Sequence, residues 1–362
     1  MNRFPVNRLS NSILLQPRDI QPSRADWKVV GVFNPAVVLL GKDHMMIARV
    51  AERPSEKRLG WTAVPSWARD RSATVDWIRD EDLQVSDARV ALLKPSGDLR
   101  LTSVSHLQVF RQSTIENRRW ELVGAVLPEE AWEEYGIEDP RITKIDSTYW
   151  ITYVAVSRSG AATALLSSED MVTFQRHGII FASENKDVVL FPQRVANNYL
   201  SLHRPNPSSH FSPPQIWLAR SPDLIHWGQH QPILKGIHHW EGDRVGGGTP
   251  PILIDEGWLT LYHGSERSDI AGTVGRYAAG AILLDRDDPS RVIARSAEPI
   301  MMPTLECETS GFVPNVVFPT AMLDAGDHWD VYYGAADTSV AMTQFSKQSI
   351  LDSLVPTSKE HS

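Results

Sequence analysis

The chain has 362 residues, of which 42% are hydrophobic and 22% charged, a composition typical of globular proteins. Its formal net charge of −8 argues against a nucleic-acid partner held by a basic face, and no stretch approaches the roughly 18 consecutive apolar residues of a membrane helix. With Cys307 as its single cysteine and a start that lacks the apolar core of a secretory signal, the chain is expected to be cytoplasmic.

Five segments in chain order share one plan: a proline, an apolar stretch, a polar turn and a strand of alternating character. They are FNPAVVLLGKDHMMIARV, EDPRITKIDSTYWITYVAVS, LFPQRVANNYLSLHRP, TPPILIDEGWLTLYHGS and FPTAMLDAGDHWDVYYGAAD. Each segment predicts a β-hairpin. The expected turns are Lys42-Asp43, Asp146-Ser147, Asn197-Asn198, Glu256-Gly257 and Gly326-Asp327.

A second element repeats in step with the hairpins. The sequence SEDMVTF at 168–174 matches SPDLIHW at 221–227, which is 53 positions later, and the hairpin prolines Pro140 and Pro192 are 52 apart. Units of roughly 50 residues that are rich in short strands are typical of propeller blades. We therefore predict an all-β fold, a five-bladed β-propeller, as a single domain over residues 1–355 followed by a polar tail at 356–362.

The first repeat interval is unusually long. Pro35 and Pro140 are 105 positions apart, which predicts an insertion in or after the first blade, at about 61–122. The sequence there still indicates strands and turns. Short helical turns are expected around 80–86 and 129–135, and no long amphipathic helix pattern is present.

Ionisable residues recur at corresponding places in the repeats, close to the strands that would line a central channel. The second repeat contains Asp139, followed by Pro140 and Arg141. Proline at 140 predicts an extended backbone for Asp139, which would fix the direction of its carboxylate. A purely structural alternative is that Asp139 accepts hydrogen bonds in a turn and pairs with Arg141.

Four basic residues cluster in the third and fourth repeats: Lys186, Arg204, Arg244 and His263. Clustered cations beside the glycines at 246–248 would suit an oxyanion such as phosphate. Each has a structural alternative: a solvated lysine, a hydrogen-bonded core histidine, or glycines that allow close strand packing. A Walker A loop, a GxSxG elbow and any grouping with metal-ligand spacing are absent from the sequence, so we expect no metal.

The ordered motifs FNPA, RLG, IEDPRI, KDVVLFP, LHRP, RVGGGTPPI, LYHG, NVVFPT and YYGAAD resemble those of glycoside hydrolase family 130. The resemblance runs from Asn34 to Asp337. It implies a five-bladed propeller that cleaves β-mannosides with inversion, in most members by phosphorolysis and in a subset by hydrolysis.

The resemblance also implies roles for individual residues. Asp139 would be the general acid, acting through the 3-hydroxyl of the mannose in subsite −1. Phosphate would be bound by Lys186, Arg204, Arg244 and His263, and the −1 sugar by Asn34, Arg58 and Asp337. Further contacts to substrate are expected from Arg141, Asp187, His203, Tyr262 and Glu308. The expected product is α-mannose 1-phosphate, with inorganic phosphate as co-substrate and no cofactor. The chain could form a homo-oligomer, and the resemblance leaves this open.

Three departures from the family pattern stand out: Arg244 where lysine is common, Gln193 where glutamate is common, and the long insertion. Retained cations favour phosphorolysis because phosphate needs no second carboxylate to activate it. The alternatives are a hydrolase with Glu306 or Glu308 as base, a non-catalytic glycan-binding propeller, and another glycosidase using Asp139 with Asp187 and Asp337. Sequence alone leaves the linkage, β-1,2 or β-1,4, and the acceptor open.

Overall fold

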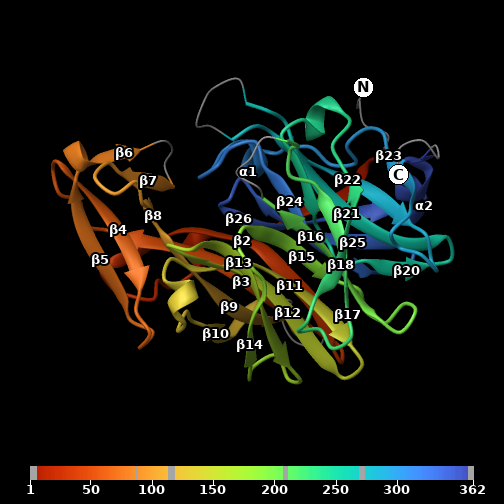
Figure 1. Ribbon diagram of the computed structural model, residues 1–362, viewed down its shortest axis with the longest axis horizontal. Coiled ribbons are helices and arrows are strands. Elements are labelled where there is room, and N and C mark those ends of the chain that lie inside the picture. Colours follow the sequence, from red (N-terminus) through yellow and green to blue (C-terminus); the bar gives the residue numbers. More distant parts are fainter. Residues whose placement is uncertain (1–5, 86–88, 113–118, 207–210, 269–273, 358–362) are drawn as a thin grey trace.

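The computed structural model describes residues 6–85, 89–112, 119–206, 211–268 and 274–357, and these are mostly β-strand. Antiparallel sheets follow one another along the chain (Figure 1). Within the described residues, no helix has the length and apolarity that crossing a membrane requires.

The first four sheets are each built mainly from consecutive strands. The first contains β2 (Trp27–Leu40), β3 (Asp43–Pro54), β9 (Val104–Gln112) and β10 (Glu121–Val126). The second contains β11 (Gly136–Ile145), β12 (Thr148–Ser157), β13 (Gly160–Ser168) and β14 (Gln175–Phe181), and a parallel pair between Gly136 and Ser105 joins it to the first. The third contains β15 (Asn185–Leu190), β16 (Tyr199–Pro205), β17 (Ile216–Ser221) and β18 (Gly228–Leu234). The fourth contains β19 (Arg244–Gly247), β20 (Ile252–Ile254), β21 (Gly257–Ser265), β22 (Tyr277–Leu284), β23 (Val292–Ser296) and β27 (Leu354–Pro356).

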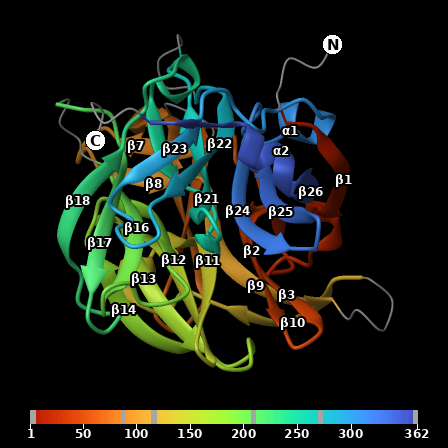
Figure 2. The same cartoon turned by 90° about the vertical axis from the view of Figure 1, so that its right-hand side faces the viewer.

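Both ends of the chain build the fifth sheet. It contains β24 (Val317–Asp324), β25 (His328–Ala335), β26 (Ser339–Ser346) and, on the outer edge, β1 (Arg8–Leu15). Figure 2 shows β1 alongside β26, and the two strands pair antiparallel with Asn11 opposite Thr343. A strand from the start of the chain therefore completes a sheet made at its end.

Neighbouring sheets pack face to face through apolar side chains. The third and fourth sheets share a cluster that includes Leu202 and Trp258, and the fourth and fifth share one that includes Leu261 and Val331. Similar clusters join the first sheet to the second, the second to the third, and the fifth back to the first. Burial of these alternating apolar residues is the main source of stability.

Between β3 and β9 the chain forms two small sheets. One pairs β4 (Trp61–Trp67) with β5 (Ala73–Arg79), and the other contains β6 (Leu83–Val85), β7 (Val90–Leu93) and β8 (Leu99–Leu101). They lie to one side of the larger sheets (orange in Figure 1). Of the predicted insertion at 61–122, residues up to about 101 form these two added sheets. The residues after 101 supply β9 and the start of β10, which belong to the first sheet.

The helices of the described residues are short. They are η1 (Pro17–Asp19), η2 (Asp80–Asp82), η3 (Ala131–Glu133), η4 (His239–Glu241), α1 (Glu306–Thr309) and α2 (Lys347–Asp352). The turns η2 and η3 fall where the sequence predicts helical turns. The predicted tail at 356–362 is wrong at its start, because Pro356 pairs with Ala294 in β27 and Thr357 donates to the carbonyl of Ile293; residues 358–362 lie outside the described residues.

The five predicted hairpins are present, but three of the predicted turns are displaced by one residue. Asp146 and Ser147 form the turn between β11 and β12 as expected, and residues 326 and 327 lie in the loop between β24 and β25. The other turns fall at residues 41–42, 196–197 and 255–256. At two of them the left-handed backbone of Gly41 and Asn197 sets the position.

The second sequence repeat forms the same turn twice. Between β13 and β14 the Ser168 hydroxyl accepts from the amide of Met171, and Asp170 accepts from two further amides. Between β17 and β18, Ser221 and Asp223 make the equivalent bonds. The serine and aspartate of the repeat are thus explained by local hydrogen bonding to the backbone.

Three sheets share a buried Glu-Tyr-Arg cluster. In each, one carboxylate oxygen of a glutamate in a short helical turn accepts a hydrogen bond from a tyrosine of the second strand and pairs with an arginine of a strand farther out in the sheet. The other oxygen of the glutamate accepts hydrogen bonds from two backbone amides. The clusters are Glu133 with Tyr153 and Arg176, Glu241 with Tyr262 and Arg295, and Glu308 with Tyr333 and Arg8. Breaking such a buried pair costs about 3–5 kcal/mol, so each cluster holds its loop to its sheet.

Candidate functional site

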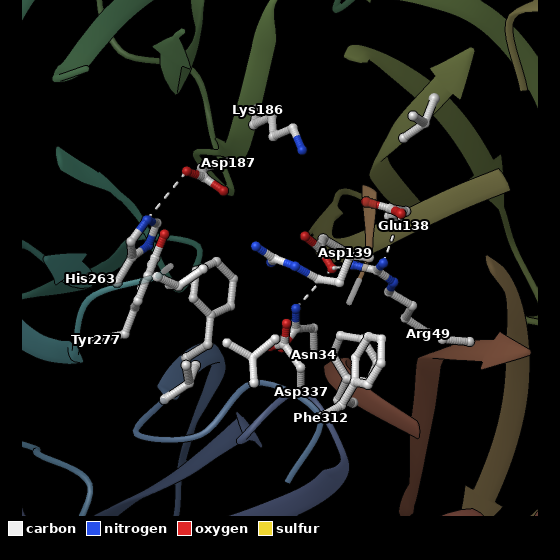
Figure 3. Close-up of a pocket in the computed structure, with 18 of the residues that line it drawn as sticks. Asn34, Arg49, Glu138, Asp139, Lys186, Asp187, His263, Tyr277, Phe312 and Asp337 are labelled. Atoms are coloured by element: carbon white, nitrogen blue, oxygen red, sulfur yellow. Dashed lines mark hydrogen bonds and ion pairs between the residues drawn. The ribbon is translucent and has the colours of Figure 1, made fainter. Parts of the chain in front are cut away.

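A cavity of about 350 Å³ opens where the first strands of several sheets converge. Most of its polar lining comes from β2, β3, β11, β15, β16, β19, β21 and β22, together with the turn after β25, and part comes from the inserted segment. Eight predicted residues line it: Asn34, Asp139, Lys186, Asp187, Arg204, Arg244, His263 and Asp337. Figure 3 shows Lys186, Asp187 and His263 on one side of this cavity and Glu138 and Arg49 on the other.

Four of these residues have left-handed backbone, among them Asp337 in the turn after β25, with a φ of 49°. Asn34, Asp139 and Asp187 have φ values of 49°, 50° and 56°, and each lies at an irregularity in the register of the first strand of its sheet. The predicted extended backbone of Asp139 is therefore wrong. Such a conformation costs of the order of 1–3 kcal/mol and persists only where surrounding contacts enforce it.

Arg49 and Asn34 hold the Asp139 carboxylate. Arg49 Nη1 lies 3.0 Å from Asp139 Oδ1 and its Nη2 lies 2.7 Å from Glu138 Oε1, while Asn34 Nδ2 donates to Asp139 Oδ1 at 2.8 Å. Burial alone would raise the pKa of Asp139, but Arg49 and the hydrogen bond from Asn34 outweigh it and hold the pKa below its ordinary value. Asp139 is thus ionised at neutral pH.

A second carboxylate of the cavity, Asp337, titrates differently. Burial, with the negative charges of Asp139 and Glu138 nearby, outweighs Arg49 and Arg89 and raises the pKa of Asp337 to about 6. The cavity therefore contains two neighbouring aspartates whose pKa values are shifted in opposite directions, an arrangement associated with functional sites.

Asp187 organises the basic side of the cavity. Its Oδ2 pairs with Arg204 Nε and lies 3.4 Å from His263 Nε2. Although burial opposes it, the charge of Arg204 lowers the pKa of Asp187 to about 2, so this carboxylate stays ionised. Burial also lowers the pKa of His263 to about 3, which leaves its ring neutral at neutral pH.

The other two cations are less enclosed. Arg244 Nε donates to Asp243 Oδ2 at 2.6 Å. Among the described residues no carboxylate pairs with Lys186, and its ammonium group points into the cavity (Figure 3). Charged donors that converge on one space form a natural anion site.

Glycines at 246–248 allow close packing rather than exposing their amides. Gly246 pairs with His263 in the ladder, and a Cβ there would lie 2.3 Å from Asp187 Oδ2 and 2.5 Å from the His263 ring. The amide of Gly248 donates to the carbonyl of Leu261. These glycines therefore permit close strand contact, which is the structural alternative stated from the sequence.

Five other predicted residues do not line the cavity. Arg58 is exposed, pairs with Glu56 and stacks over Trp77. Tyr262 and Glu308 belong to the buried Glu-Tyr-Arg clusters.

The side chains of His203 and Arg141 also bind residues outside the cavity. His203 contacts Asn185 and His230, with Nε2 3.1 Å from His230 Nδ1. Arg141 lies behind Asp139 and donates to the carbonyl oxygens of Gly248, Asp139 and Pro140. The structural alternative stated from the sequence, an ion pair of Asp139 with Arg141, is not found, because Asp139 pairs with Arg49 instead.

Sequence reasoning missed several lining residues. Arg49 interrupts the apolar run of β3, and a charge in a buried strand was a usable signal. Glu138 lies in the EDPR motif itself. Tyr277 stacks on His263, and Arg89 comes from the inserted segment; no motif marked either one.

Within the described residues, no group of three or more His, Cys, Asp or Glu side chains is arranged to hold a metal ion. The polar groups of the cavity are instead carboxylates facing cations. This arrangement can bind a polyhydroxylated ligand beside an anion, with an ionisable carboxyl between them.

Comparison with known proteins places the chain among mannoside phosphorylases. Residues 101–355 match the sequence profile of glycoside hydrolase family 130, described as β-1,4-mannooligosaccharide phosphorylase. The β-1,2-mannobiose phosphorylase of Listeria innocua is 35% identical over 96% of this chain and 98% of the relative, and that of Thermoanaerobacter sp. is 38% identical over 96% and 99%. The solved Listeria innocua enzyme in complex with β-1,2-mannobiose superimposes with a TM-score of 0.86, covering 94% of this chain and 96% of that one.

Proposed function

Because the chain belongs to glycoside hydrolase family 130, we propose that it is a phosphorylase that cleaves β-1,2-mannobiose with inversion, giving α-mannose 1-phosphate and mannose. The observation that carries this proposal is the division of one cavity into a carboxylate side around Asp139 and a basic side around Lys186 and Arg204. A phosphorylase needs both an acid for the leaving oxygen and cations for the nucleophile.

In this proposal phosphate binds on the basic side. Lys186, Arg204 and Arg244 supply positive charge, and the neutral His263 ring contributes a hydrogen bond. Held there, phosphate faces the anomeric carbon on the side opposite the leaving sugar, as inversion requires. Positioning an already anionic nucleophile can account for several kcal/mol of the barrier reduction.

Asp139 supplies the proton for the leaving oxygen, through the 3-hydroxyl of the mannose. Arg49 and Asn34 keep the pKa of Asp139 low, so Asp139 must gain a proton before the reaction. A bound phosphate adds negative charge to the same cavity, and a nearby like charge raises the pKa of a carboxyl group. Phosphate binding thus favours the protonated, reactive form of Asp139.

The remaining lining residues bind the sugar. Asn34 and Asp337 lie beside Asp139 and can hydrogen-bond the hydroxyls of the −1 mannose. Arg58 plays no part in this proposal, because its guanidinium is held by Glu56 and Trp77 away from the cavity. Arg141 acts from behind by fixing the backbone at Asp139.

We assign the sheets to the five blades of a propeller. Support comes from the succession of antiparallel sheets, the packing of each on the next and of the fifth on the first, and the closure of the last sheet by β1. In this arrangement the cavity lies at the axis, where first strands meet. The reaction uses inorganic phosphate and gives a charged product, which favours a cytoplasmic location.

Hydrolysis finds less support in the cavity. The two candidate bases, Glu306 and Glu308, do not line it, and Glu308 is committed to Arg8 and Tyr333. Asp187 lies on the nucleophile side, but a pKa of about 2 makes it a poor proton acceptor.

The test is to incubate the protein with β-1,2- and β-1,4-mannobiose, with and without inorganic phosphate, and to measure mannose 1-phosphate and free mannose. We expect mannose 1-phosphate to form only with phosphate and faster from the β-1,2 disaccharide. Release of two mannose molecules at the same rate without phosphate would show a hydrolase. A faster reaction with the β-1,4 disaccharide would correct the linkage alone.

A further inference from the structure

One wall of the cavity comes from the inserted segment. Arg89, Val90, Leu101 and Ser103 line it, although they lie outside the recurring hairpins. Val90 begins β7 and Leu101 ends β8, and the two are register partners. Paired residues of neighbouring strands project from the same face, so these two side chains form an apolar pair directed at the cavity.

The rest of the small sheet packs elsewhere. Ala91, next to Val90 on β7, belongs with Val64 and Leu83 to a separate small core inside the insertion. Strand alternation therefore gives the sheet one face for its own stability and another for the cavity. Val90 and Leu101 therefore line the cavity, whereas the core around Ala91 holds the insertion together.

This wall adjoins the carboxylate side of the cavity. Arg89 is close enough to Asp337 to lower its pKa, whereas the four cations come from β15, β16, β19 and β21. In an inverting displacement the nucleophile and the leaving group occupy opposite faces of the reacting carbon. With phosphate on the basic side, the leaving sugar must lie toward the wall from the insertion.

We propose that Arg89, Val90, Leu101 and Ser103 form an acceptor wall, against which the leaving sugar packs and which ends the site after one sugar unit. The proposal rests on the proposed phosphorylase function. Val90 and Leu101 offer an apolar surface to the C–H face of the ring, and Arg89 and Ser103 offer polar groups to its hydroxyls. A cavity of about 350 Å³ is at the lower end of the roughly 300–1,000 Å³ usual for small-molecule sites, which fits a short ligand.

The acceptor wall is tested by changing Leu101 in both directions. In the synthetic direction, with mannose 1-phosphate as donor, mannose and β-1,2-mannobiose are compared as acceptors. Leu101→Ala should raise the KM for mannose by roughly tenfold and shift preference toward mannobiose, whereas Leu101→Phe should shift it toward mannose. The KM for mannose 1-phosphate should change less than about twofold in both variants.

Leu99→Ala is the matched control, because Leu99 lies on the same strand but is 60% exposed and does not line the cavity. It should leave both acceptors unchanged. Equal acceptor ratios in wild type, Leu101→Ala and Leu101→Phe would overturn the acceptor wall while leaving phosphorolysis intact. A wild-type protein without phosphate-dependent activity would instead overturn the proposed function. If the Leu101 variants do not fold, Val90→Ala serves the same comparison.

Discussion

Replacing Asp139 by asparagine tests the centre of the proposed reaction with little change in structure. Asp139 Oδ1 accepts from Asn34 and from Arg49. An amide oxygen can accept both bonds, so the left-handed backbone at this position should persist. The variant removes the group that would carry the proton and keeps most of the contacts that position it.

The expected loss follows from the role of a general acid. Proton transfer of this kind contributes roughly 10²–10⁴-fold, so kcat for mannobiose phosphorolysis in Asp139→Asn should fall by that factor. An aryl β-mannoside with a nitrophenolate leaving group needs no proton, and its rate should fall much less. Phosphate-dependent release of mannose 1-phosphate and of nitrophenol measures the two rates.

The phosphate site provides the internal control. The KM for phosphate should change less than about threefold in Asp139→Asn, because the basic side of the cavity is intact. Full activity toward mannobiose would refute the assignment of Asp139 as acid. Equal losses with both substrates would also refute it, since they would indicate a structural defect rather than a missing proton.

Three further predictions address other parts of the molecule. Lys186→Ala should raise the KM for phosphate about tenfold or more, because a hydrogen bond to a charged group is worth about 1.5–3 kcal/mol. Initial rates over a series of phosphate concentrations measure this KM, and Lys28→Ala, at an exposed lysine, is the control. Burial raises the pKa of Asp337 to about 6 in the folded protein, against 3.8 in the unfolded chain, so deprotonation of Asp337 destabilises the fold as pH rises through 6. Asp337→Asn should therefore raise the free energy of unfolding by up to about 3 kcal/mol at pH 8 and by only about 0.5 kcal/mol at pH 4, measured by urea titration. Tyr262→Phe should lower the free energy of unfolding by about 1–3 kcal/mol, because the buried Glu241 loses one hydrogen-bond donor. The KM for either substrate should stay the same. A change in KM without a loss of stability would instead place Tyr262 at the site.

Repetition made much of the secondary structure predictable. Hairpins recur with the same proline and turn chemistry, and the serine and aspartate at 168 and 170 form the turn that recurs at 221 and 223. Turn positions were less predictable, because one left-handed residue such as Gly41 or Asn197 shifts a two-residue turn by one place. Pairing of β1 with β26 joins residues more than 300 positions apart, and no local pattern reports it.

Site residues were predictable where the family motifs place charged side chains on the strands around the cavity, with Arg204 and His263 on second strands. Asp139, Lys186 and Asp187 line the cavity as the motifs indicate. Motif membership failed for Tyr262, because a strand sends alternate side chains to opposite faces, and this one faces a buried glutamate rather than the cavity. Arg49 was missed for the converse reason: its strand carries no motif, and only the fold brings it to Asp139.

In the proposed mechanism, charge balance across the cavity couples phosphate binding to the protonation of Asp139. Without phosphate, Asp187 stays ionised and offsets the charge of Arg204, while His263 remains neutral because it is buried among cations. A dianion entering this side adds negative charge, which raises the pKa of His263 as well as that of Asp139. In the proposed mechanism, phosphate therefore shifts Asp139 toward its protonated form, so the acid is readier to donate when the nucleophile is present. Water brings no such charge and would leave Asp139 ionised, so in the proposed mechanism the protonation of Asp139 favours phosphate over water as the nucleophile.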